Sequence, residues 1–276
     1  MLTSINFGRG AVTAGAVRQA RGLSNRLLDA LISADPAFVE RRTLTVSVKP
    51  GEQLFDIASP LSTVYFPLSA VVSLMQSARD GATCASGFVG SDGIVGIDCV
   101  LGAGRTSSRA VVRQPGLVVC APVNLVTSSF DSSAVARSAL IAYAHEAYVA
   151  TSKSVLCSQR HTVQQRVSLQ LLQIFERANS RELMLSQDCM GEMLGVRREG
   201  VTEAAGILRE MGIIEYRRGR LTVIDPAGLS RQACDCYDGR HRAVSAQRVR
   251  PEVGAARYPR PQREIARHLT AESALA

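Results

Sequence analysis

Four polar residues with helical spacing, Arg198, Glu199, Thr202 and Glu203, could bind the edges of nucleic-acid bases. On a helix these positions project together from the N-terminal half. Arginine can donate two hydrogen bonds to guanine O6 and N7, and glutamate can accept one from a cytosine amine, both in the major groove of DNA. The pattern therefore predicts a base-reading helix.

The segment around these residues predicts two helices, a sharp turn and a small β wing. Ser186 can cap the first helix, and Gly195 interrupts it. A second helix is expected from about Arg197 to Met211, because apolar residues recur there at three-to-four spacing. Residues 213–224 alternate as two short strands around an Arg-Gly turn. The predicted contacts to the DNA backbone are Ser186, Arg197, Arg217, Arg218 and Arg220.

This stretch resembles the Crp-Fnr superfamily of bacterial transcription regulators. Gly195, Arg198, Glu199 and Val201 match the turn glycine and the early positions of that family's recognition helix. The resemblance implies that Arg198 and Glu199 read bases. Glu203 stands where many members carry a second base-contacting Arg. The operator sequence of relatives therefore does not carry over.

Charge and composition favour a cytoplasmic protein. The net charge of +8 lies at the chain ends, since residues 1–26 carry four Arg and no acid, and residues 239–276 carry eight Arg and three Glu. Both ends are expected to be disordered. Apolar runs stay far below the roughly 20 residues that span a bilayer, and no secretory signal is recognisable. Seven cysteines without framework spacing indicate a reducing compartment.

A β-rich region predicts a closed β-roll or jelly roll between Arg42 and Pro122, after a helix in residues 22–40. The region resembles the cyclic-nucleotide-type sensor domain of the same superfamily, matched by Gly51–Phe55 and by Tyr65–Val72. Glycines at every third position in residues 87–96 are expected to form tight turns. The expected strands are 44–48, 63–66, 71–75, 110–112 and 117–119.

The resemblance implies an effector pocket around Gly96, Ile97, Ser108 and Arg109. Nucleotide-binding members hold the ribose and the cyclic phosphate with a Gly-Glu pair and an Arg-Ser pair. Here Ile97 replaces the Glu, and Ser108 aligns with the phosphate-binding Arg. Arg109 lies one residue away, which in a strand turns it to the other face. Because the polar groups of cyclic AMP would stay unpaired, we expect another effector.

Residues 123–190 contain neither Gly nor Pro and are expected to be mostly helical. Alternating four and three spacing predicts a coiled-coil dimer seam, and packing against the chain's own β-roll is the alternative. The family resemblance favours the dimer. Thr162 and Gln165 predict a capping box that restarts a helix after a hinge. The predicted seam residues are Leu140, Tyr143, Ala147 and Ala150.

Metal and enzyme chemistry have little support in the sequence. His161 could bind metal, but a lone His beside a cap is more often structural. Cys234 and Cys236, with His241, could ligate a metal, although their spacing is one residue shorter than the usual zinc motif. No histidine lies in the β region, and no catalytic triad or paired carboxylate stands out. We expect no metal, no cofactor and no catalytic residues, with Cys99 and Cys120 as buried fillers.

These observations predict an α+β protein that regulates transcription. Its parts are a disordered N-terminus (1–21), a β-roll sensor domain with a leading helix (22–131), a dimerisation helix (132–160), a winged helix-turn-helix (161–237) and an Arg-rich disordered tail (238–276). Its predicted partners are double-stranded DNA, a second copy, RNA polymerase and an unidentified small-molecule effector, and no membrane. The alternative is a ligand-binding or protein-interaction module whose DNA-binding domain has lost specific binding.

Overall fold

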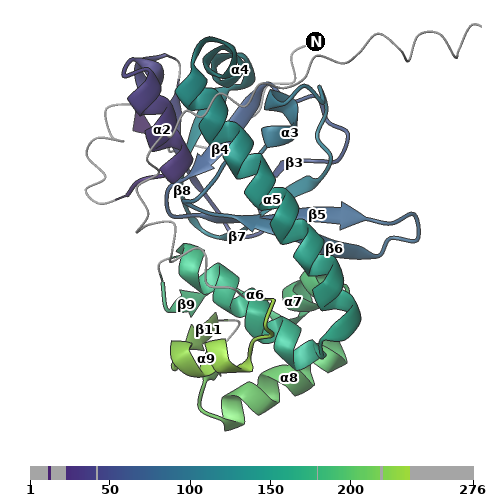
Figure 1. Cartoon of the computed structure of the whole chain (residues 1–276). Helices are drawn as coiled ribbons and strands as arrows, with labels where there is room; N and C mark the ends of the chain where they lie inside the picture. The colour runs from purple at the N-terminus through teal and green to yellow at the C-terminus, as the bar shows by residue number, and fades with distance from the viewer. Residues whose placement is uncertain (1–11, 14–22, 42, 179, 218–219, 237–276) are drawn as a thin grey trace, which may run out of the picture. The chain divides into compact units, whose positions relative to one another are not determined.

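The computed structural model describes residues 12–13, 23–41, 43–178, 180–217 and 220–236 (Figure 1). Most of the two ends expected to be disordered lies outside these residues, as do Arg218 and His241. Within the N-terminal segment expected to be disordered, Val12–Thr13 instead form strand β1, which pairs with β2. The reason is that β2 offers a free edge whose backbone groups β1 satisfies.

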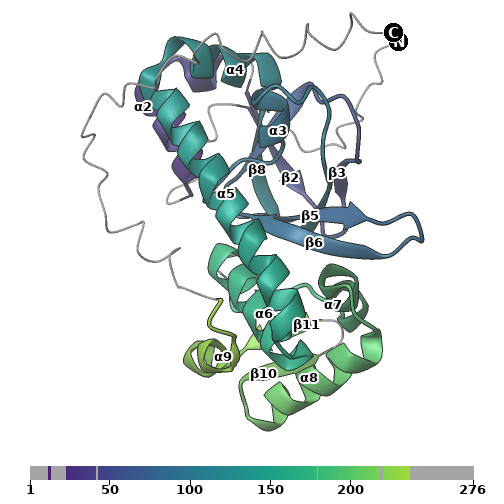
Figure 2. The ribbon, with the colours of Figure 1, turned by 45° about the vertical axis from the view of Figure 1, so that its right-hand side comes forward.

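Two four-stranded antiparallel sheets form the β-roll, as expected from the sequence (Figures 1 and 2). The first has the order β1-β2-β8-β4, with β2 Leu44–Val48, β8 Gly116–Pro122 and β4 Thr63–Pro67. The second has the order β3-β7-β5-β6, with β3 Gln53–Phe55, β7 Arg109–Gln114, β5 Val71–Ser77 and β6 Thr83–Val89.

Strand β6 corrects the expectation of tight turns throughout residues 87–96. Gly87 lies inside β6 and pairs with Leu74 of β5, because a glycine can also take extended backbone. The turn conformation appears at Gly96, where φ is 98° and the short helix α3 (Ile97–Val100) begins. A Cβ at Gly96 would stand 2.6 Å from Leu61, so this position has no room for a side chain.

The β-roll is packed on both sides of each sheet. Its interior holds apolar side chains from both sheets, including Phe55, Tyr65 and Val112. The outer face of the first sheet packs on helices, through residues such as Phe66. The outer face of the second sheet contributes Val71 and Met75 to the core of the C-terminal helical part.

Helices fill most of residues 123–190, as the absence of Gly and Pro predicted, although Glu182–Leu183 form a short strand. The first three are α4 (Val123–Ser132), α5 (Ala134–Arg160) and α6 (Val163–Ala178), and the leading helix is α2 (Arg26–Ala34) followed by the 3-10 turn η1 (Phe38–Glu40). The predicted capping box is present: Gln165 N–H donates to Thr162 Oγ1 at 3.3 Å, and Thr162 N–H donates to Gln165 Oε1 at 3.1 Å. It separates α6 from α5.

The predicted dimer seam is wrong for its first two residues. Leu140 is fully buried against the chain's own α2 and β-roll core. The Tyr143 hydroxyl donates to the backbone oxygen of Ile94 at 3.1 Å, and any Cβ at Gly93 would overlap the Tyr143 ring. Helix α5 carries an apolar stripe on more than one side, and periodicity alone did not identify the stripe that faces its own domain.

The C-terminal part is a winged helix-turn-helix packed on α6. It comprises β9 (Glu182–Leu183), α7 (Gln187–Leu194), α8 (Arg198–Glu210), β10 (Ile214–Arg217), β11 (Arg220–Val223) and α9 (Pro226–Gln232). The small sheet has the order β10-β11-β9. The α+β fold class is thereby confirmed. In the described part of the chain, no helix combines the length and apolarity needed to cross a bilayer.

Candidate DNA-binding surface

The turn between α7 and α8 has the geometry that the sequence predicted. Ser186 caps α7, and its Oγ accepts from Cys189 N–H at 3.1 Å. Gly195 ends α7 in the left-handed region, with φ 63° and ψ 39°. Glycine adopts this conformation without the steric cost that a Cβ brings. The turn therefore directs α8 away from α7 at a defined position.

Helix α8 buries one face and exposes the other. Val201, Ala204, Ala205 and Leu208 are buried in the core of the winged helix. The four predicted base-reading residues lie on the exposed side, in the first half of the helix. All four side chains are open to solvent: Arg198, Glu199, Thr202 and Glu203.

Two of these residues are held by α7, which sequence reasoning did not foresee. Arg198 Nη1 lies 3.3 Å from Asp188 Oδ1, and Thr202 Oγ1 donates to Gln187 Oε1 at 2.8 Å. The side chains of Arg198 and Asp188 are 63% and 65% exposed, so their pairing is weak and easily exchanged for a base or phosphate. Gln187 and Asp188 thus belong to the same polar surface.

The wing presents arginines beside this surface. Arg217 and Arg220 pair across the β10–β11 ladder, and both are exposed. Arg217 Nε lies 2.8 Å from Glu215 Oε1, and Arg220 Nη1 lies 3.5 Å from Glu182 Oε2. Arg197 is exposed at the N-cap of α8. Exposed ion pairs such as these are weak, so Arg217 and Arg220 could exchange them for phosphates. The Ser186 hydroxyl, by contrast, is already engaged as a cap.

The predicted effector residues do not form one charged cradle. Ile97 packs against the helical core outside the roll, and Ser108 is buried. Arg109 is turned outward, and its Nη2 donates to Glu192 Oε1 of α7 at 3.2 Å. The physical reason is strand alternation: Ala110 and Val112 of β7 point into the roll, so Arg109 points away.

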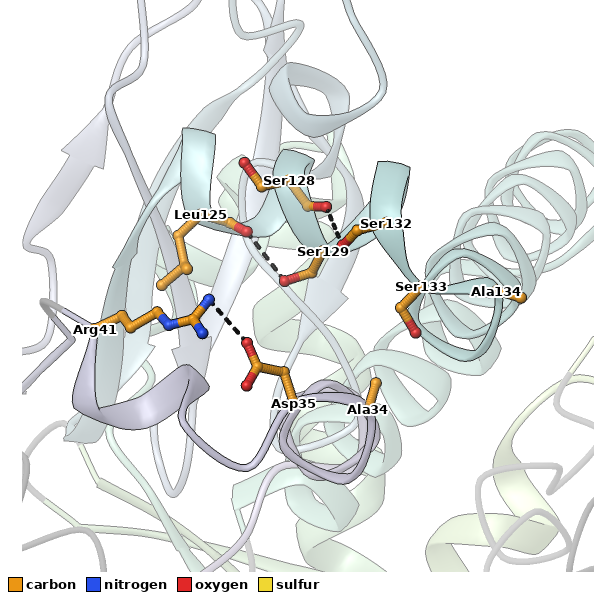
Figure 3. Close-up of a pocket in the computed structure, with 9 residues that line it drawn as sticks. All are labelled: Ala34, Asp35, Arg41, Leu125, Ser128, Ser129, Ser132, Ser133 and Ala134. Atoms are coloured by element: carbon orange, nitrogen blue, oxygen red, sulfur yellow. Dashed lines mark hydrogen bonds and ion pairs between the residues drawn. The ribbon is translucent and has the colours of Figure 1, made fainter.

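A cavity of about 480 Å³ lies elsewhere in the sensor part, between the end of α2 and the α4–α5 junction (Figure 3). Arg41 extends over it and pairs with Asp35 at 3.0 Å. Its serines are partly engaged, since Ser129 Oγ donates to the Leu125 oxygen at 3.1 Å and Ser132 Oγ to the Ser128 oxygen at 2.7 Å. The cavity is open and polar, and no sequence pattern had indicated it.

Comparison with known proteins agrees with this geometry. Residues 165–232 match the family model of the Crp-like helix-turn-helix domain. The fold is similar to that of FixK2 from Bradyrhizobium japonicum, with 18% identity, a TM-score of 0.60, and coverage of 70% of this chain and 98% of that one. This is a Crp-Fnr fold with a Crp-like helix-turn-helix domain. The predicted resemblance to the Crp-Fnr superfamily is confirmed for the fold and for the helix-turn-helix domain.

Other Crp-Fnr structures give the same result. A CRP/FNR-family transcriptional regulator from Thermus thermophilus has 20% identity and a TM-score of 0.55, covering 68% of this chain and 97% of that one. The c-di-GMP-responsive global regulator CLP from Xanthomonas campestris has 14% identity and a TM-score of 0.54, covering 71% and 97%. No curated protein matches the sequence. Both of these neighbours are described as regulators.

Proposed function

We propose that this chain is a homodimeric, sequence-specific DNA-binding regulator of the Crp-Fnr type that responds to a signal other than cyclic AMP. The observation that carries the proposal is helix α8. Its apolar face is buried in the winged helix, while Arg198, Glu199 and their neighbours stand exposed directly after the Gly195 turn. A helix presented in this way fits the major groove.

Specificity on this surface depends on where side chains stand rather than on bulk charge. Residues 27–238 carry nearly equal numbers of acidic and basic groups. A near-neutral body gains little from non-specific attraction to phosphates. Arg198 and Glu199 supply a donor fork and an acceptor, which together can distinguish a G·C pair from the other pairs. Thr202 and Glu203 would adjust that choice, and Arg217, Arg218 and Arg220 would contact phosphates.

Exposed apolar residues on α5 support a dimer, on a different face from the predicted seam. Ile141, Tyr148 and Val155 are 51%, 71% and 61% exposed, and they recur every seventh residue. This heptad spacing is that of a coiled-coil seam, and large apolar side chains on a helix favour a partner. Pairing two copies along this line would present two recognition helices to one DNA site.

The sensor part supports a signal other than cyclic AMP. The interior of the roll is filled with apolar side chains, and Arg109 is directed to α7 instead of toward the interior. A signal received near Ile94 would reach α5 directly, because Tyr143 donates to the Ile94 backbone oxygen. Ligands other than cyclic AMP occur in this fold, since the Xanthomonas regulator responds to c-di-GMP.

We also propose that the protein is cytoplasmic and that RNA polymerase is a further partner.

In vitro selection from a random DNA library, with the full-length chain, tests the proposal. We expect enrichment of a two-fold symmetric site whose half-sites lie roughly 10 base pairs apart. The Arg198→Ala/Glu199→Ala double variant should lose this enrichment, and Arg209→Ala, at the far end of α8, should keep it. Failure of the native chain to enrich any sequence, with or without cell extract as a source of effector, would favour the interaction-module alternative. A thermal-shift measurement with cyclic AMP should show no stabilisation.

A further inference from the structure

Four metal-ligating side chains meet where α5 ends and the chain leaves α9. They are Cys157, His161, Cys234 and Cys236, and their donor atoms all lie within 4.8 Å of one another. Cys157 Sγ is 3.5 Å from Cys234 Sγ, and Cys236 Sγ is 3.6 Å from His161 Nδ1. Cys157 and Cys234 are buried, and the other two are half-buried.

Two of these separations are close to those in a tetrahedral zinc site. Zinc binds thiolate sulfur at about 2.3 Å and histidine nitrogen at about 2.0–2.1 Å, which in a tetrahedron sets the S···S distance near ~3.8 Å and the S···N distance near ~3.6 Å. Three thiolates and one imidazole form a common structural zinc set. The two observed separations, 3.5 Å and 3.6 Å, are close to these values.

The surroundings of the cluster also suit a metal. The other nitrogen of His161, Nε2, lies 3.2 Å from Asp235 Oδ1. A carboxylate on the remote nitrogen of a metal-binding histidine fixes the tautomer that leaves the near nitrogen free to bind. On the buried side, Leu169 and Ala233 pack against the cysteines and shield them from water.

We propose that Cys157, His161, Cys234 and Cys236 bind one structural Zn²⁺ ion. Zinc is favoured over harder divalent ions because three of the four donors are sulfur. A simple disulfide between Cys157 and Cys234 is the competing interpretation. It would use only two of the four converging groups and would leave the placement of Cys236 and His161 without a purpose.

The ion would join two parts of the chain that are distant in sequence. Cys157 is in the last turn of α5 and His161 follows that helix as its C-cap, whereas Cys234 and Cys236 follow α9 of the winged helix. A bound ion would therefore fasten the end of the winged helix-turn-helix to the hinge at residue 161. The sequence suggested Cys234 and Cys236 with His241, and His161 on its own, as metal ligands. It did not connect Cys157 with Cys234 or His161 with Cys236, because these pairs lie 77 and 75 residues apart.

Metal titration of the reduced, full-length protein tests the proposal. After removal of metal with a chelator, Co²⁺ should bind one ion per chain and give the visible ligand-field bands of tetrahedral cobalt, with thiolate-to-cobalt charge transfer in the near ultraviolet. One equivalent of Zn²⁺ should abolish both signals and raise the midpoint of thermal unfolding. A cobalt spectrum without thiolate charge transfer, or no uptake under reducing conditions, would overturn the zinc site.

Single-residue variants identify which side chains bind the ion. Cys236→Ser should remove one sulfur ligand, weaken zinc retention at least ~10-fold and reduce the charge-transfer intensity, while His161→Gln should keep three thiolates and shift only the visible bands. The matched control is Cys84→Ser, because Cys84 is an exposed cysteine outside the cluster. Mass spectrometry of unreduced protein tests the competing interpretation. A stoichiometric disulfide between Cys157 and Cys234, in protein that binds no zinc after reduction, would establish it.

Discussion

Arg109 of β7 and Glu192 of α7 form an ion pair at 3.2 Å, and this pair joins the β-roll to the first helix of the winged helix-turn-helix. Arg113, further along β7, reaches the same carboxylate at 3.5 Å. Helix α7 also packs against β6. The orientation of the winged helix in this structure is therefore set by polar contacts from the sensor part as well as by the core that it shares with β5.

Arg113→Ala should lower the free energy of unfolding by about 1–3 kcal/mol, because it leaves the buried Ser73 hydroxyl and the half-buried Glu192 carboxylate without this donor. Arg113 is 6% exposed and its Nε donates to Ser73 Oγ at 2.7 Å. Arg231→Ala is the matched control: its pair with Asp225 is exposed and should contribute under about 1 kcal/mol. Urea unfolding measures both, and equal losses would show that the Arg113 contacts carry no special weight.

Arg198→Ala should cost about 1–3 kcal/mol of binding to the selected DNA site and relax the preference at one base pair. Arg217→Ala should weaken binding to all sequences similarly and reduce the salt dependence, since its expected contact is a phosphate. Fluorescence anisotropy at several salt concentrations, on selected and random duplexes, separates the two. The assignment of roles is wrong if both variants lose the same fraction of affinity on both duplexes.

Tyr148→Glu should convert the proposed dimer to a monomer, because it places a charge in the middle of the exposed α5 line. Ala150→Glu is the informative control. Ala150 belongs to the seam predicted from sequence, is exposed, and lies on a different side of the helix from Tyr148. Sedimentation equilibrium measures the association state. Dissociation by Ala150→Glu but not by Tyr148→Glu would restore the original seam.

Gly195→Ala should destabilise the reader by about 1–2 kcal/mol, since alanine must then adopt the left-handed backbone at φ 63°. Gly206→Ala should do the opposite and add about 0.5–1 kcal/mol, because Gly206 is inside α8 and a Cβ there would meet nothing within 4 Å. Thermal unfolding of the two variants beside the native chain is sufficient. A stabilising Gly195→Ala would show that the turn relaxes to another geometry.

Alkylation at pH 8 should modify Cys84 well before Cys99 or Cys120. Cys84 is exposed, whereas burial raises the pKa of the Cys120 thiol to about 12 and also raises the pKa of Cys99. A thiol whose pKa lies above the pH remains protonated, and only the thiolate reacts. The reactivity of Cys99 and Cys120 should therefore rise with pH. Peptide mapping after brief iodoacetamide treatment checks this, and early labelling of Cys120 in folded protein would reopen a redox role for it.

Local features of the fold could be predicted from the sequence, and distant pairings could not. The Gly195 turn and the Thr162–Gln165 cap follow from short-range backbone chemistry and are present. Strand β6 was missed because Gly87 was interpreted as a turn residue, although glycine also fits extended backbone.

Among the site residues, those set by local sequence could also be predicted, and those set by distant contacts could not. The exposure of the predicted base-reading residues on α8 could be predicted from the helical period alone. The burial of Leu140 and the pairing of Arg109 with Glu192 depend on which surfaces meet in space, and one helix stripe cannot specify its partner. The convergence of Cys157 with Cys234 was invisible for the same reason, since no local pattern connects them.

The break between α5 and α6 makes each helix complete without the other. His161 N–H closes the end of α5 on the Cys157 oxygen at 3.2 Å, and Thr162 with Gln165 satisfies the start of α6. Rotation about the backbone between residues 161 and 162 therefore breaks no hydrogen bond within either helix. If its contacts with the second sheet were released, the winged helix could turn about this point at almost constant helix content. Circular dichroism would then register little of the change, whereas distance measurements between labels on α5 and α8 would follow it.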